Sequence, residues 1–256
     1  MPRFAANLST LFTEVPFLQR FERAAAAGFT AVEYLFPYDY DPKELRGLLD
    51  DLDLEQVLFN LPPGDWDAGD RGTAALPNRR EAFRDSVGKA IEYARALRCT
   101  NLHAMAGIVP DSDRARCKQT FVENIRFAAD AAAAHGLTIL IEALNDRDVP
   151  GYLFAHQGEA AELVRRIDRT NVSVQLDYYH AQIMDGDLTR LTEEMDFGHV
   201  QIASVPLRHE PDEGEIDYDH VFATLDRVGY EGWVGCEYNP RGDTDAGLDW
   251  IRPYLG

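Results

Sequence analysis

The chain has 256 residues and a strong acidic excess, with 44 Asp and Glu against 25 Lys and Arg and a formal net charge of −19. Such a surface repels phosphate backbones, which argues against nucleic-acid binding as a main role. Hydrophobic residues make up 45% and charged residues 27%, close to the averages for globular proteins, so we expect neither disorder nor a membrane protein.

The three cysteines are Cys99, Cys117 and Cys236; they show no CxxC spacing, and three cannot all pair within one chain. This use of cysteine fits a reducing compartment, so we expect a cytoplasmic location. The first residues, MPRFAANLS, lack the long apolar run of a secretory signal, and the Ala-rich stretch 127–135 is too short to span a bilayer.

Short strand-like runs alternate with amphipathic helical stretches along the whole chain. We expect strands over residues 4–8, 31–36, 56–60, 101–106, 138–144, 172–177, 199–204 and 233–238. We expect helices over residues 17–27, 42–52, 79–98, 113–135, 158–168, 187–195, 218–228 and 245–254. Gly28 and Gly136 stand where helices commonly end, and Asp187 stands where one commonly begins.

Eight strand and helix pairs of about 32 residues each match the size of a (β/α)8 TIM barrel. A doubly wound α/β sheet is the main alternative, but no GxGxxG fingerprint follows the first strand. No linker divides the chain, so we expect a single domain over residues 1–256. The longest irregular stretch, 61–78, follows the third strand, where a barrel places lids and substrate walls.

Four expected strands in the second half of the chain end on an oxygen-bearing polar residue. These residues are Glu142, Asp177, Gln201 and Glu237. A buried, unpaired charge is costly, and a divalent cation would remove that cost. In a barrel the carboxyl ends of strands 5 to 8 share one mouth, so the four residues can converge there. Three carboxylates and one amide favour Mg²⁺ or Mn²⁺, and ordinary surface or ion-paired strand ends are the alternative.

Other polar residues are expected near the same mouth. His180 follows Asp177 and could donate a hydrogen bond to a substrate oxygen, while Arg208 follows the seventh strand and could hold a substrate carboxylate. A structural role is the alternative for both. Asn7, Glu33, Asn60 and His103 could also line the mouth, and for these a structural role is favoured.

Two carboxylates that flank a metal suit proton abstraction next to a carbonyl. Return of the proton to the adjacent carbon gives isomerisation, and return to the opposite face of the same carbon gives epimerisation. The sequence has no GxSxG, P-loop or HExxH motif to indicate a different chemistry.

Several motifs of this chain resemble the hydroxypyruvate isomerase group of the xylose-isomerase-like TIM barrels, which includes the 2-oxo-tetronate isomerases. The matching stretches run from one terminus to the other: RFAANLSTLFTEVPFLQRF, FPYDYD, FNLPPGDWDAGDRG, LIEALN, VQLDYYHAQIMDG, HVQIASVPLRHEPDEGEIDY and GYEGWVGCEYNPRG. FTEVPF and PLRHEPDEGEID look more like the 2-oxo-tetronate branch, whereas LPPGDWDAGDRG and LNDRDVPGY look more like the hydroxypyruvate branch.

The resemblance implies residue roles that the pattern alone does not. It implies metal ligation by Glu142, Asp177, Gln201 and Glu237, with proton transfer by Glu142 and Glu237. Similarity to related sugar epimerases suggests substrate contacts from His180 and Arg208. Those epimerases carry a histidine where Gln201 stands here, which puts a detailed transfer of their mechanism in doubt.

From these observations we expect a metal-dependent isomerase of a small hydroxy-oxo acid. The first expected reaction converts hydroxypyruvate to 2-hydroxy-3-oxopropanoate (tartronate semialdehyde). The alternatives are 2-oxo-tetronate isomerisation, from 2-dehydrotetronate to 3-dehydrotetronate, and ketose 3-epimerisation. A metal-dependent endonuclease is disfavoured by the net charge and by the small number of histidines, seven. A non-catalytic binding protein is the remaining alternative. The expected partner is the small-molecule substrate, without nucleic acid or membrane, and similarity suggests a homo-oligomer.

Overall fold

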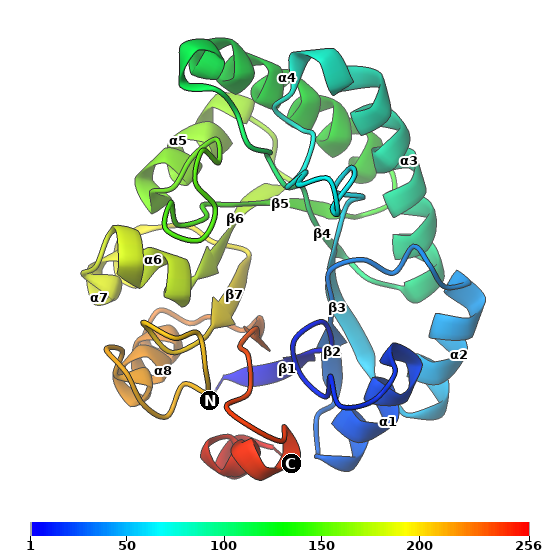
Figure 1. The fold of residues 1–256 in the computed structure, drawn as a ribbon, viewed down its shortest axis with the longest axis vertical. Helices are drawn as coiled ribbons and strands as arrows, with labels where there is room; N and C mark the ends of the chain where they lie inside the picture. Colours follow the sequence, from blue (N-terminus) through cyan, green and yellow to red (C-terminus); the bar gives the residue numbers. More distant parts are fainter. Residues whose placement is uncertain (1, 256) are drawn as a thin grey trace.

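The computed structural model describes residues 2–255 as a closed barrel of eight parallel strands ringed by helices (Figure 1). Each strand pairs with its neighbours in chain order, and β8 closes the barrel against β1. The strands are β1 Arg3–Asn7, β2 Ala31–Glu33, β3 Glu55–Asn60, β4 Asn101–His103, β5 Thr138–Glu142, β6 Val172–Asp177, β7 His199–Ile202 and β8 Trp233–Cys236. The expected (β/α)8 barrel is confirmed, although β2, β4, β5, β7 and β8 are shorter than the runs expected from the sequence, and Glu237 lies just after β8 rather than at its end.

The helical layer follows from apolar stripes at helical spacing. In α3, for example, Phe83, Val87, Ala90 and Leu97 are buried against the barrel. The α-helices are α1 Phe17–Ala26, α2 Pro42–Asp51, α3 Arg80–Leu97, α4 Arg114–Ala133, α5 Gln157–Ile167, α6 Tyr178–Met184, α7 Leu188–Glu194 and α8 Tyr218–Arg227. Short 3₁₀ helices are η1 Pro77–Arg79, η2 Asp111–Asp113, η3 Asp245–Trp250 and η4 Arg252–Tyr254. Within residues 2–255, no helix combines the length and the apolar character needed to cross a membrane.

Two helical elements differ from the expectation. The α-helix expected over 245–254 is wrong, because this stretch forms the 3₁₀ helices η3 and η4. Gly247 is a poor helix former, and Pro253 has no N–H to donate within an α-helix. The short helix α6 was not expected at all. It begins directly after β6, with Asp177 as its N-cap, and places His180 in its first turn.

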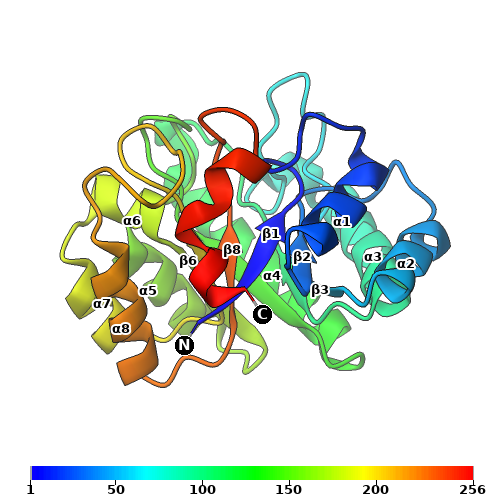
Figure 2. The same ribbon diagram turned by 90° about the horizontal axis from the view of Figure 1, so that it is seen from below.

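All eight strands point the same way, so their carboxyl ends form one face of the barrel. In Figure 2 this face is at the top, and the long loop after β3, drawn in pale cyan, rises from it. The register places Asp177 of β6 beside Gln201 of β7, and Gln201 beside Gly235 of β8. The strand ends in the second half of the chain therefore meet at one mouth.

Polar side chains that contact one another around Glu33 occupy the barrel interior below this mouth. The fully buried carboxylate of Glu33 accepts hydrogen bonds from Asn7 Nδ2 at 3.0 Å and Gln201 Nε2 at 2.7 Å, and His199 Nε2 lies 2.7 Å away. Gly235 leaves the space for it, because a Cβ there would lie 2.2 Å from Oε1 of Glu33. The position of the Glu33 carboxylate therefore requires a glycine at position 235, although the two residues lie far apart in the sequence.

Gly235→Ala is expected to destabilise the protein by about 1–3 kcal/mol, because the added methyl displaces Glu33 from its hydrogen bonds. Urea unfolding would measure the loss. Gly88→Ala is the matched control: Gly88 lies in α3 with nothing within 4 Å of an added Cβ, so alanine should stabilise slightly. Equal stability of Gly235→Ala and the wild type would contradict the fixed position of Glu33.

Candidate active site

A cavity of about 350 Å³ opens at the carboxyl face of the barrel. Its volume lies in the range of small-molecule sites. Of the six site residues expected from the sequence, the cavity wall contains Glu142, His180, Arg208 and Glu237. The remaining wall residues are Ser9, Thr10, Leu35, Asn60, Trp66, Arg71, His103, Met105, Leu144, Asp148, Val149 and Asn239. The cavity therefore has carboxylates and a cation on its β5 to β8 side and an aromatic and cationic wall from the loop after β3.

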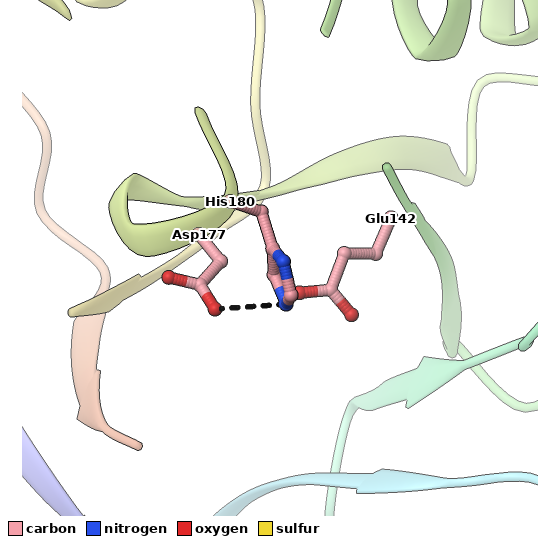
Figure 3. A group of neighbouring side chains, drawn as sticks. All are labelled: Glu142, Asp177 and His180. Atoms are coloured by element: carbon pink, nitrogen blue, oxygen red, sulfur yellow. Dashed lines mark ion pairs between the residues drawn. The ribbon is translucent and has the colours of Figure 1, made fainter. Parts of the chain in front are cut away.

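Glu142, Asp177 and His180 form a buried cluster whose candidate ligand atoms all lie within 4.8 Å of one another. Figure 3 shows the ring of His180 between the carboxylates of Asp177 and Glu142. Nε2 of His180 lies 3.5 Å from Oδ2 of Asp177. The cluster joins the end of β5 to the β6–α6 junction, residues that are separated in sequence and brought together by barrel closure.

The two oxygens of Asp177 have different tasks. Oδ1 accepts the backbone N–H of Tyr179 at 2.8 Å and so caps helix α6. Within residues 2–255, Oδ2 of Asp177 and Oε1 of Glu142 are buried and accept no hydrogen bond. Buried carboxylate oxygens that accept no hydrogen bond are costly, and a hard divalent cation takes such oxygens as ligands. The carboxylate oxygens of Asp177 and Glu142 therefore fit a metal ion.

The hydrogen bonds of His180 define its tautomer. Nδ1 accepts from the backbone N–H of Asn145 at 3.1 Å and lies 2.7 Å from the side-chain nitrogen of the same residue. Both partners are donors, so Nδ1 carries no proton and Nε2 is the protonated nitrogen. Burial, followed by the charge of Arg208, lowers the pKa of His180 well below its usual value, so the ring is neutral. We infer that His180 presents an N–H donor to the cavity.

Arg208 links Glu237 to the cluster. Its Nη2 lies 2.8 Å from Oε2 of Glu237 and 3.6 Å from Oδ2 of Asp177, and its guanidinium stacks over Tyr179 at 4.8 Å from the ring centroid. Burial opposes the charge of Arg208, but the combined charges of Glu237, Asp177 and Glu142, with Tyr179, raise its pKa. Arg208 itself has φ +58°, a left-handed conformation that non-glycine residues seldom adopt.

The three carboxylates all have raised pKa values because they are buried together. Burial raises the pKa of Asp177 to about 6 and that of Glu237 to about 7, with Arg208 opposing both shifts. Burial, then the charges of Asp177 and Glu237, raises the pKa of Glu142 well above its usual value. Perturbed carboxylates gathered in a cavity are typical of catalytic sites.

Gln201 lies beside Asp177 but has its amide engaged in the barrel interior. Its Nε2 donates to Glu33, and its Oε1 accepts from Nε2 of Gln175 at 2.6 Å. These two bonds also assign the amide orientation, since a carboxylate can only accept. Its oxygen consequently faces Gln175 rather than Glu33.

Sequence reasoning missed the network that supports His180. Asn145 bonds to both His180 and Asp148, and Asp148 accepts the hydroxyl of Tyr179 at 2.6 Å. Arg147 donates to that same hydroxyl at 2.7 Å. The signal was present as the polar run NDRD, residues 145–148, which follows β5 after Ala143 and Leu144 and is unusual beside a buried strand. Its partners on α6 could not be identified before that helix was known.

Comparisons with known proteins agree with the fold. The family described as the xylose isomerase-like TIM barrel matches residues 21–254, and the chain belongs to this family. It is an enzyme of the isomerase class, as are its curated relatives.

Three known proteins illustrate how close the similarity is. A 2-oxo-tetronate isomerase of Pectobacterium atrosepticum is 56% identical over 258 residues, which cover 100% of this chain and 98% of the relative. A hydroxypyruvate isomerase of Escherichia coli is 46% identical over 257 residues, which cover 99% of this chain and 100% of the relative. A crystal structure from Brucella melitensis, described as an AP endonuclease of family 2, is 61% identical, with a TM-score of 0.99 and complete coverage of both chains.

Proposed function

We propose that this chain is a single-domain, metal-dependent isomerase that moves a carbonyl between adjacent carbons of 2-oxo-tetronate. The observation that carries the proposal is the buried cluster of Glu142, Asp177 and His180, with Glu237 in the same cavity. The choice of substrate is supported by the identity of 56% to a 2-oxo-tetronate isomerase. Hydroxypyruvate, which the sequence placed first, is the second candidate and is supported by the relative at 46% identity.

We propose that Glu142, Asp177, Gln201 and Glu237 hold the metal, with Mg²⁺ or Mn²⁺ favoured by an all-oxygen donor set. When bound, such an ion polarises the carbonyl and hydroxyl oxygens of an α-hydroxycarbonyl compound and stabilises the negative charge of an enediolate. The buried oxygens of Glu142 and Asp177 that accept no hydrogen bond support this assignment. For Gln201 to contribute, its oxygen would have to serve the ion as well as Gln175.

The protein groups have complementary proposed roles in proton transfer. Glu237 removes the proton from the hydroxyl-bearing carbon; it lies in the cavity wall, and in the metal-free protein burial raises the pKa of its carboxyl to about 7. Glu142 delivers a proton to the neighbouring carbon, the hydroxyl proton of the substrate passes to the former carbonyl oxygen, and proton exchange with solvent returns both glutamates to their starting states. The neutral His180 donates Nε2–H to a substrate oxygen, and Arg208 contacts the substrate while it keeps Glu237 oriented.

Two further expectations belong to the same proposal. The three cysteines are free and buried, which fits the reducing cytoplasm expected from the sequence. A nucleic-acid substrate is disfavoured because the net charge of −19 would repel a phosphate backbone. The cavity wall also contains only two histidines, His103 and His180.

A substrate panel tests the proposal. With Mn²⁺ present, kcat/KM for 2-oxo-tetronate should exceed that for hydroxypyruvate by about 10- to 200-fold, the discrimination that one extra hydroxymethylene can provide in a shaped pocket. Proton NMR of the products in D₂O would separate isomers from epimers. Turnover of neither acid would reject the proposal, and an epimer of a ketose as the product would establish the 3-epimerase alternative.

A further inference from the structure

Two arginines line the cavity, and only one of them is neutralised. Arg208 pairs with Glu237 and Asp177. Arg71, on the loop after β3, belongs to the same cavity wall, yet within residues 2–255 it has no carboxylate at ion-pair distance. The sequence marked this loop as a lid or substrate wall but did not single out this residue.

The hydrogen bonds of Arg71 leave part of its guanidinium available. Nη1 donates to the carbonyl oxygens of Asp70 at 2.7 Å and Trp66 at 3.2 Å. The guanidinium carbon lies 3.8 Å from the ring centroid of Trp66, and Trp66 packs edge-on against Phe36. One nitrogen and one ring face thus anchor the group, while Nη2 and Nε remain as a pair of donors in the geometry that a carboxylate accepts.

The acid beside Arg71 in the sequence is used elsewhere. Oδ2 of Asp70 accepts the backbone N–H of Asp65 at 2.7 Å and lies 3.2 Å from Nη1 of Arg79. The Asp70 carboxylate therefore holds the loop together through Asp65 and Arg79. It does not compensate the charge of Arg71.

The backbone on the other side of Arg71 is tightly held. Gly72 donates its N–H to Pro63 at 2.9 Å and forms a bridge with Ala106. With φ +102°, Gly72 passes so close to Met105 that a Cβ would lie 2.2 Å from the carbonyl oxygen. Only glycine allows this approach, and the approach fixes Arg71 at the cavity wall. A preorganised cation loses little entropy on binding an anion.

The net charge of the site indicates a binding role for Arg71. Glu142, Asp177 and Glu237 with Arg208 amount to −2 when ionised, a charge that one divalent cation would balance. A substrate carboxylate then adds a negative charge that none of these groups offsets. We propose that Arg71 binds the carboxylate of the substrate and selects hydroxy-oxo acids over neutral ketoses. This inference rests on the proposed function and assigns the carboxylate contact to Arg71, with Arg208 at the reacting end.

The test replaces Arg71 by methionine, which keeps an unbranched apolar stem and removes the guanidinium with its charge. With Mn²⁺ present, Arg71→Met should raise KM for 2-oxo-tetronate about 10- to 100-fold, which is the effect of losing one charge-assisted hydrogen-bonded pair. The value of kcat should change by less than about threefold. Turnover or competitive inhibition by erythrulose, the neutral analogue, should stay within about twofold. Arg84→Met, on α3 over Phe127 and outside the cavity, controls for the loss of a positive charge.

The outcomes are distinct. An unchanged KM for the acid, equal losses for acid and neutral ligand, or the same effect in Arg84→Met would overturn the inference. Isothermal titration separates it from the proposed function: if the wild type turns over neither acid, weaker binding of 2-oxo-tetronate by Arg71→Met still supports the inference. Equal binding by the two proteins, or no binding by either, rejects it.

Discussion

Glu237→Gln is expected to lower kcat by about 10²- to 10⁴-fold, the range for removal of a general acid–base group. The amide has nearly the same shape as the carboxylate but cannot take a proton. Glu237 is suited to this role because its carboxylate lies in the cavity wall and is oriented by Arg208. KM should change far less, since Arg208 keeps a hydrogen-bond acceptor at this position and a contact with Asp177.

Steady-state kinetics at saturating Mn²⁺ would measure the effect, with the metal affinity of each variant determined separately. That second measurement distinguishes loss of the base from loss of a ligand. Glu215→Gln is the matched control, because Glu215 is an exposed carboxylate on the loop before α8 and should leave kcat unchanged. Unchanged turnover of both acids by Glu237→Gln would falsify the proton-transfer role.

Metal removal is expected to abolish turnover, and Mn²⁺ is expected to stabilise the protein in a pH-dependent way. At a concentration 100 times Kd, an ion that binds only the folded state adds about 2.7 kcal/mol, or about 5–10 °C in Tm for a chain of this size. Chelator followed by re-addition of Mn²⁺, with activity and Tm followed together, would measure both effects. Full turnover by demonstrably metal-free protein would contradict this prediction.

The sign of the pH dependence follows from the raised pKa values. Burial raises the pKa of Asp177 to about 6 and of Glu237 to about 7, so without metal the folded state holds protons that the unfolded chain releases at lower pH. That contribution to stability is complete below the unfolded pKa, near 4, and is lost as pH rises through 6 to 7. The increase in Tm with Mn²⁺ should therefore be larger at pH 8 than at pH 5. Asp177→Asn should reduce this difference.

The strand ends of the second half of the chain were predictable because each is a local pattern. An apolar run that ends on Glu142 or Asp177 indicates a buried strand with a polar residue at its end. Eight strand and helix repeats predict a barrel in which the four polar strand ends share one mouth. The first turn of α6 was harder to foresee, since Asp177 acts both as strand end and as helix cap. Periodicity over so short a helix carries little information.

Contacts across the barrel were beyond sequence reasoning. The bond of His180 to Asn145 spans 35 residues and sets the tautomer, and the bond of Gln201 to Glu33 spans 168 residues and sets the amide orientation. Neither pairing can be recognised from the spacing of residues along the sequence. Each depends on strand register and closure, which are properties of the assembled barrel.

The buried carboxylates at the barrel mouth illustrate which properties follow from the sequence and which follow from the tertiary structure. The sequence by itself determined the eight repeats, the polar residue at each of four expected strand ends and the long loop after β3. Each of these features depends on hydrophobic spacing and turn-forming residues that are neighbours in the sequence. Only the tertiary structure decided which oxygens remain without partners, which arginine is neutralised and which is available. Those properties depend on distances between residues far apart in the chain, and such distances exist only once the barrel has closed.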